Sequence, residues 1–113
     1  MSDQRVNQMF RAFADETRLR ILHLLTRGEL CVCDIMRVIQ ASQPKVSRHL
    51  SYLKRAGLVT DRRDGRWRHY SLAQPKSDFQ KRLIDCVGGC LDEAPTLKRD
   101  ADKLVSINKV RCR

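Results

Sequence analysis

Long apolar runs are absent from this chain of 113 residues. A helix that crosses a bilayer needs about 20 consecutive apolar residues, and no run here approaches that length. We therefore expect no membrane partner. The opening residues, Met1-Ser2-Asp3-Gln4, are not followed by the apolar segment of an export signal, so we expect a cytoplasmic protein.

Aromatic residues are scarce, at 5% of the chain. Proteins that hold single-stranded nucleic acid stack its bases on aromatic side chains, so this scarcity disfavours that class of partner. The chain also has no glycine-rich loop for phosphates, and His23 shows no orienting acid that would suit a Cys-His nucleophile. We expect neither an enzyme nor an organic cofactor.

A disulfide scaffold is also disfavoured, because the number of cysteines is odd and no export signal is visible. Reduced cysteines in a cytosol serve as buried structural residues, metal ligands or redox sensors. Spacing must decide among these uses. The five are Cys31, Cys33, Cys86, Cys90 and Cys112.

Positive charge is abundant and concentrated. The net charge is +10, which favours a polyanionic partner. Residues 43–69 contain eight lysines and arginines but only two aspartates, so this quarter of the chain carries more than half of the excess. That concentration argues against basic residues that are simply spread over a solvated surface.

Apolar spacing and capping residues predict five helices and a hairpin. Asp15 and Ser42 are suited to cap helices, and Gly28 and Gly57 to end them. Asp64-Gly65 is a hairpin turn signal. The predicted helices cover residues 5–14, 15–28, 32–39 and 42–57 and one that starts near residue 78, with strands at 58–61 and 66–72.

Two segments follow from this pattern. Residues 1–95 form one domain, and residues 96–113 form a tail or weak helix, because Pro95 ends or kinks any helix that reaches it. A domain this small has a limited core and often adds a dimer interface. Apolar faces on the first and last predicted helices, from Val6 to Phe13 and from Phe79 to Val87, suit such an interface.

Two closely joined helices followed by a basic hairpin indicate a mainly α fold, the winged helix-turn-helix. The helix at 42–57 would enter the major groove of double-stranded DNA. Arg48 projects away from its apolar stripe and is favoured for a base contact, while His49 on the flank either donates to a phosphate or packs. Further candidates on this helix are Gln43, Lys45 and Ser47, and hairpin candidates for phosphates or the minor groove are Arg62, Arg63 and Arg66.

A resemblance to a known family rests on three segments: Glu29-Leu30-Cys31-Val32-Cys33-Asp34, Ser42-Gln43-Pro44-Lys45-Val46-Ser47-Arg48-His49-Leu50, and Gly65-Arg66-Trp67-Arg68-His69-Tyr70. In motif order and spacing the chain resembles the ArsR/SmtB family of winged-helix metalloregulators, particularly its arsenical-resistance repressors. The resemblance implies a homodimeric repressor on an inverted repeat in its operator, which leaves the DNA when a metal or metalloid binds. It also implies dimerisation through the first and last helices.

Cys31 and Cys33 are the predicted inducer site. Arsenite and antimonite are soft and select thiolates, and a helix N-terminus lowers the pKa of a thiol. Residues two apart on a regular helix point about 200° away from each other. Either the turn that holds Cys31 and Cys33 is therefore irregular already, or binding must unwind it and so disturb the DNA-reading helix.

The third sulfur is left open. Relatives with this motif often carry a cysteine where this chain has Met36, which is read first as a core residue and second as a ligand. Cys86 and Cys90 share a helix face and suit either a second thiol site or an apolar interface. Cys112 and an exogenous thiol are the other candidates. The same thiols would also serve a cadmium or lead sensor, or a redox or reactive-sulfur sensor.

Overall fold

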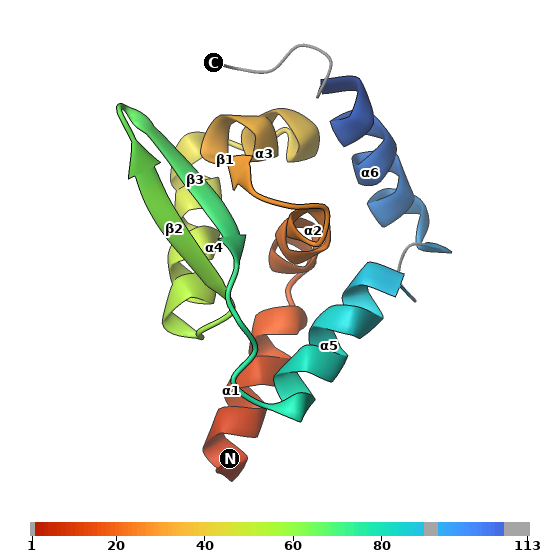
Figure 1. The fold of residues 1–113 in the computed structure, drawn as a ribbon. Helices are drawn as coiled ribbons and strands as arrows, with labels where there is room; N and C mark the ends of the chain where they lie inside the picture. The colour runs from red at the N-terminus through yellow and green to blue at the C-terminus, as the bar shows by residue number, and fades with distance from the viewer. Residues whose placement is uncertain (1, 90–92, 108–113) are drawn as a thin grey trace.

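The computed structural model describes residues 2–89 and 93–107. These residues form a group of helices with a small sheet at one side (Figure 1). Within the described residues, no helix is long and apolar enough to cross a bilayer. The elements in chain order are α1 (Asp3–Phe13), α2 (Glu16–Leu25), β1 (Leu30–Cys31), α3 (Val32–Ile39), α4 (Gln43–Arg55), β2 (Val59–Asp64), β3 (Trp67–Leu72), α5 (Asp78–Gly89) and α6 (Pro95–Ile107).

The predicted caps of α2 and α4 are confirmed. The carboxylate of Asp15 accepts a hydrogen bond from the backbone N–H of Arg18 at 3.0 Å, and the hydroxyl of Ser42 accepts one from Lys45 at 3.4 Å. Each bond satisfies one of the N–H groups that a helix leaves without a partner at its first turn. Between α3 and α4, Gln40 takes a left-handed φ of 55°, which ends α3 and turns the chain towards α4.

The predicted hairpin is also confirmed, with Gly65 at a φ of 63° in its turn. The sheet has one strand more than the sequence predicted. Its order is β1-β3-β2, and β1 pairs antiparallel with β3. A strand of two residues has too few positions to show alternation, so its sequence carries no strand signal.

The core lies where α2, α3 and α4 meet the inner face of the sheet. The apolar stripe predicted for α4 faces this core, because Val46, Leu50 and Leu53 are fully buried. Leu58 and Val59 continue the core into the wing. The opposite face of α4 is left to solvent.

Helix α6 agrees with the helix alternative predicted for the C-terminal segment but corrects the role predicted for Pro95. Pro95 begins this helix and does not end one, since proline is tolerated in a first turn, where its missing N–H is not needed. Leu97, Leu104 and Ile107 are buried, and α6 packs against α2 and α3. The guanidinium of Arg20 on α2 donates to both carboxylate oxygens of the buried Asp100 at 2.8 and 3.0 Å. Residues 108–113 lie outside the described residues.

We expect Asp100→Asn to lower the free energy of unfolding by about 1–3 kcal/mol, because a buried charge-assisted pair would lose one charge. Urea unfolding followed by circular dichroism measures this. Asp102→Asn is the control, since Asp102 is exposed on the same helix and should change stability by less than about 0.5 kcal/mol. Equal effects would mean that the Arg20–Asp100 pair does not hold α6 in place.

Candidate thiol site and DNA-binding surface

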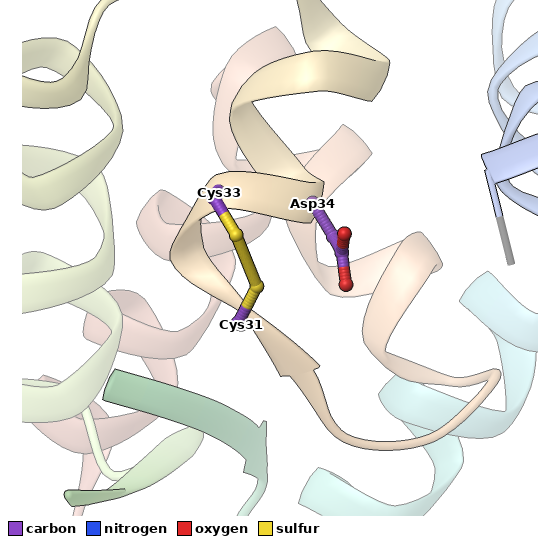
Figure 2. A group of neighbouring side chains, drawn as sticks. All are labelled: Cys31, Cys33 and Asp34. Atoms are coloured by element: carbon purple, nitrogen blue, oxygen red, sulfur yellow. A yellow bond between two sulfur atoms is a disulfide. The ribbon is translucent and has the colours of Figure 1, made fainter. Parts of the chain in front are cut away.

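Cys31 and Cys33 are held by different kinds of backbone. Cys31 is the last residue of β1 and the N-cap of α3, with extended dihedral angles of φ −79° and ψ 156°. Cys33 is the second residue of α3 itself. The two Cα atoms are 5.4 Å apart, and the structure joins the sulfurs in a disulfide (Figure 2).

This arrangement decides between the two alternatives set by the spacing. The divergence of about 200° applies only when both residues are helical, and Cys31 is not. The sulfurs therefore meet without any change in α3. The alternative in which binding must first unwind this turn is wrong.

A third donor lies beside the sulfurs. The ligand atoms of Cys31, Cys33 and Asp34 all lie within 4.8 Å of one another, and the Asp34 side chain is almost fully buried (Figure 2). The sequence pattern alone does not single out Asp34 as a ligand. The signal that could have identified it is its place as the third residue of a helix, where acidic side chains turn back to the N-terminus.

Of the other candidate ligands, Met36 and Cys86 lie within the described residues. Met36 is partly buried and packs against the core, as its first interpretation expected. Cys86 is exposed on α5. Cys90 and Cys112 lie outside the described residues.

The thiol site is attached directly to the wing. Cys31 pairs with His69 of β3, and both side chains are buried. The guanidinium of Arg62 on β2 donates to both carboxylate oxygens of Glu29 at 2.8 and 2.7 Å, and this hydrogen bonding raises the pKa of Arg62. Cys31 is therefore connected to the wing through the β1–β3 pair and to α4 through α3.

The wing is also fixed to α4. The carboxylate of Asp61 accepts from Lys54, on α4, at 2.9 Å and from Arg68 on β3. The bond from Lys54 is the main cause of the lowered pKa of Asp61, and the bond from Arg68 adds to it. These contacts set the position of the hairpin relative to the helix that carries the predicted base contacts.

Four of the residues on α4 that were predicted to contact DNA are accessible to solvent. Gln43, Lys45 and Arg48 are exposed, and Ser47 is partly exposed. His49 is turned inward: its side chain is 11% exposed, and its Nδ1 lies 3.9 Å from Asp15 Oδ1. Burial lowers the pKa of His49 despite the attraction of Asp15, so the ring is neutral at pH 7.

The three wing arginines differ in their surroundings. Arg62 is held by Glu29, whereas Arg63 and Arg66 are exposed and form no ion pair within the described part of the chain.

We therefore expect Arg63→Gln to make the dependence of DNA affinity on salt less steep. The slope of log affinity against log salt should fall in magnitude by about 0.9 for each phosphate that the wing no longer neutralises. Titrations in potassium chloride measure the slope. Arg62→Gln is the matched comparison and should change it less, because Glu29 already neutralises that charge.

Helices α3 and α4, joined through Gln40 and followed by a basic hairpin, define a winged helix-turn-helix DNA-binding protein. Residues 15–61 match the model of the family described as "Bacterial regulatory protein, arsR family". The chain is 46% identical over 87 residues to the arsenical resistance operon repressor of Escherichia coli, covering 76% of this chain and 74% of the relative. This chain belongs to the arsR family, whose members are transcription regulators and not enzymes.

Two further relatives refine the comparison. The chain is 41% identical over 81 residues to a cadmium resistance transcriptional regulatory protein CadC homolog of Staphylococcus aureus, covering 71% of this chain and 64% of the relative. The solution structure of the homodimeric winged helix-turn-helix DNA-binding domain Mb0332 from Mycobacterium bovis is 32% identical, with a TM-score of 0.66. That alignment covers 82% of this chain and 89% of the other.

Proposed function

We propose that this repressor leaves its operator when arsenite or antimonite binds the thiolates of Cys31 and Cys33. The observation that carries the proposal is the convergence of these two sulfurs at the point where β1 becomes α3. Soft donors suit a soft metalloid, and two of them from one turn form a chelate at no cost in long-range ordering. The protein acts in the cytoplasm, where such thiols are kept reduced.

The site supplies two of the three sulfur ligands that arsenite prefers. Cys31 and Cys33 would hold it, and the carboxylate of Asp34 is the third protein donor in reach. A set of two sulfurs and one oxygen also suits cadmium or lead, which is the alternative that the cadmium-resistance relative supports. The inducer would form bonds to both sulfurs. The form of the protein that makes these bonds would hold α4 and the wing in positions that do not suit DNA binding.

DNA binding is proposed to use a homodimer on an inverted repeat. Phe10 on α1 is 52% exposed and stacks edge-on against Phe79 on α5, with ring centroids 5.3 Å apart. Helices α1 and α5 lie side by side (Figure 1), and a second copy would pack against the apolar side chains on them. Two copies would place two α4 helices, with Gln43, Lys45, Ser47 and Arg48, in successive major grooves.

The thiol site affects both reading elements. Cys31 belongs to the strand that pairs with β3 and also caps α3, which packs against α4. An inducer that binds the form with misplaced α4 and wing more tightly will shift the population towards it. Because the coupling is reciprocal, operator DNA must weaken the affinity for the inducer by the same factor.

The test is fluorescence anisotropy of a labelled operator duplex bound to fully reduced protein. Arsenite, antimonite, cadmium, lead and hydrogen peroxide are titrated in parallel. Release by arsenite or antimonite at lower concentration than by the other agents supports the proposal. Failure of every soft ion under reduction overturns it.

A second function is favoured by one observation, the disulfide between Cys31 and Cys33. In a redox or reactive-sulfur sensor, oxidation of the two thiols would itself be the signal. In the same assay this function predicts release by peroxide or a persulfide and recovery of DNA binding when a reductant is added.

A further inference from the structure

A cleft of about 480 Å³ opens between the start of α3, the start of α4 and the wing. Its volume lies in the range of about 300–1,000 Å³ that accommodates small-molecule ligands. Cys33 and Met36 on α3 and Trp67 on β3 are among the residues that line it. Cys31 is 4% exposed and does not line the cleft, so the thiol pair meets this space through Cys33.

The cleft is strongly cationic. Arg63, Arg66 and Arg68 line it, and none of the described residues that line it is acidic. Arg68 is paired with Asp61, which leaves Arg63 and Arg66 to interact with an incoming anion. Guanidinium groups bind carboxylates through paired hydrogen bonds.

We propose that this cleft binds a small thiol that carries carboxylate groups. Its carboxylates would lie beside Arg63 and Arg66, and its sulfur beside Cys33. The proposal rests on the proposed function, since this thiol would supply the third sulfur to arsenite held by Cys31 and Cys33. Met36, which lines the same cleft, is a neutral thioether and cannot supply a thiolate.

The chemistry is ligand exchange without electron transfer. Arsenous acid, As(OH)₃, loses three hydroxyl groups as three S–H groups lose their protons, so three As–S bonds form and three waters leave. Cys31 and Cys33 take part as thiols, and their disulfide must first be reduced. In the experiment a phosphine supplies the two electrons and becomes a phosphine oxide, while water provides its oxygen and the two thiol protons.

An occupied cleft would also oppose DNA binding. The carboxylates would pair with Arg63 and Arg66, which are the wing residues expected to meet phosphates. The bound thiol and the operator would then compete for the same guanidinium groups, and the inducer would act through charge as well as through the positions of α4 and the wing.

The experiment titrates reduced full-length protein with arsenite in the absence of DNA, in three monothiols of different charge. These are mercaptosuccinate (two carboxylates), mercaptoethanol (neutral) and cysteamine (cationic). Trp67 is the single tryptophan of the chain and lines the cleft, so its fluorescence reports binding. We expect half-saturation at an arsenite concentration about tenfold lower with mercaptosuccinate than with cysteamine. Arsenic X-ray absorption should then count three sulfurs.

Two variants assign the preference to the cleft. Replacing both Arg63 and Arg66 by glutamine should make the three thiols equivalent. Arg99→Gln, which removes one exposed charge on α6, should retain the preference. A preference that survives the loss of Arg63 and Arg66 would overturn the cleft as the binding site.

The remaining outcomes separate this proposal from the one on which it rests. Equal arsenite affinity in all three thiols would overturn the cleft proposal, while binding at Cys31 and Cys33 would still be measured. No arsenite binding in any thiol would overturn the proposed function, and the cleft proposal with it.

Discussion

We expect that arsenite will no longer release operator DNA, at the concentrations that act on the wild type, from a variant in which Cys31 and Cys33 are both serine. Serine is close to cysteine in size but does not bind a soft metalloid, so the chelate is lost while β1 and α3 keep their shape. The concentration of arsenite needed for release should rise by at least about 100-fold, because the variant loses the binding free energy of two thiolate ligands. Anisotropy of the labelled operator gives this concentration directly.

Cys86→Ser is the matched control, because Cys86 is exposed on α5 and lies apart from the cluster formed by Cys31, Cys33 and Asp34. It should leave the response to arsenite intact. Affinity for the operator without inducer should be retained in both variants, and circular dichroism will show whether the buried substitution at Cys31 preserves the fold. Release of the double variant at the wild-type arsenite concentration would exclude these thiols as the site.

Arg48→Ala will weaken operator binding by about 1–3 kcal/mol for each bidentate base contact, which is a factor of about 5 to 150. Arg48 is exposed on α4, on the face away from Val46 and Leu50. A homodimer carries the residue twice, so the total loss should be about twice that of one contact. Competition between the operator and random duplex of equal length measures how much of the loss is specific.

Arg55→Ala removes the same charge from the end of α4 and serves as the comparison. Any effect of this change should be equal on operator and random DNA, because an exposed charge at the end of α4 would act on phosphates, which carry no sequence information. If Arg48→Ala behaves in the same way, Arg48 contacts phosphate and the base contacts fall to Gln43, Lys45 or Ser47.

Much of the fold could be predicted because it depends on signals from residues that are close together in the sequence. The caps at Asp15 and Ser42 and the turn at Gly65 depend on residues within a few positions of one another. The apolar stripe of α4 depends on helical spacing alone. These features need no knowledge of what the rest of the chain does.

Long-range contacts account for the features that local signals do not predict. Strand β1 exists only because β3 lies next to it, and α6 is held by Arg20, 80 positions away from Asp100 in the chain. The surroundings of two residues predicted to contact DNA, Arg62 and His49, are likewise set by residues that are distant in the sequence. Glu29 holds Arg62, and Asp15 lies beside the inward-turned His49.

By itself, the sequence determined that a thiol pair precedes a DNA-reading helix and a basic hairpin, since residue type and spacing are local properties. Whether the sulfurs meet depended on tertiary structure, because pairing with β3 keeps Cys31 extended and brings its sulfur to that of Cys33. The cationic cleft beside Cys33 was likewise decided by the fold, since packing brings the wing, α3 and α4 together around one space.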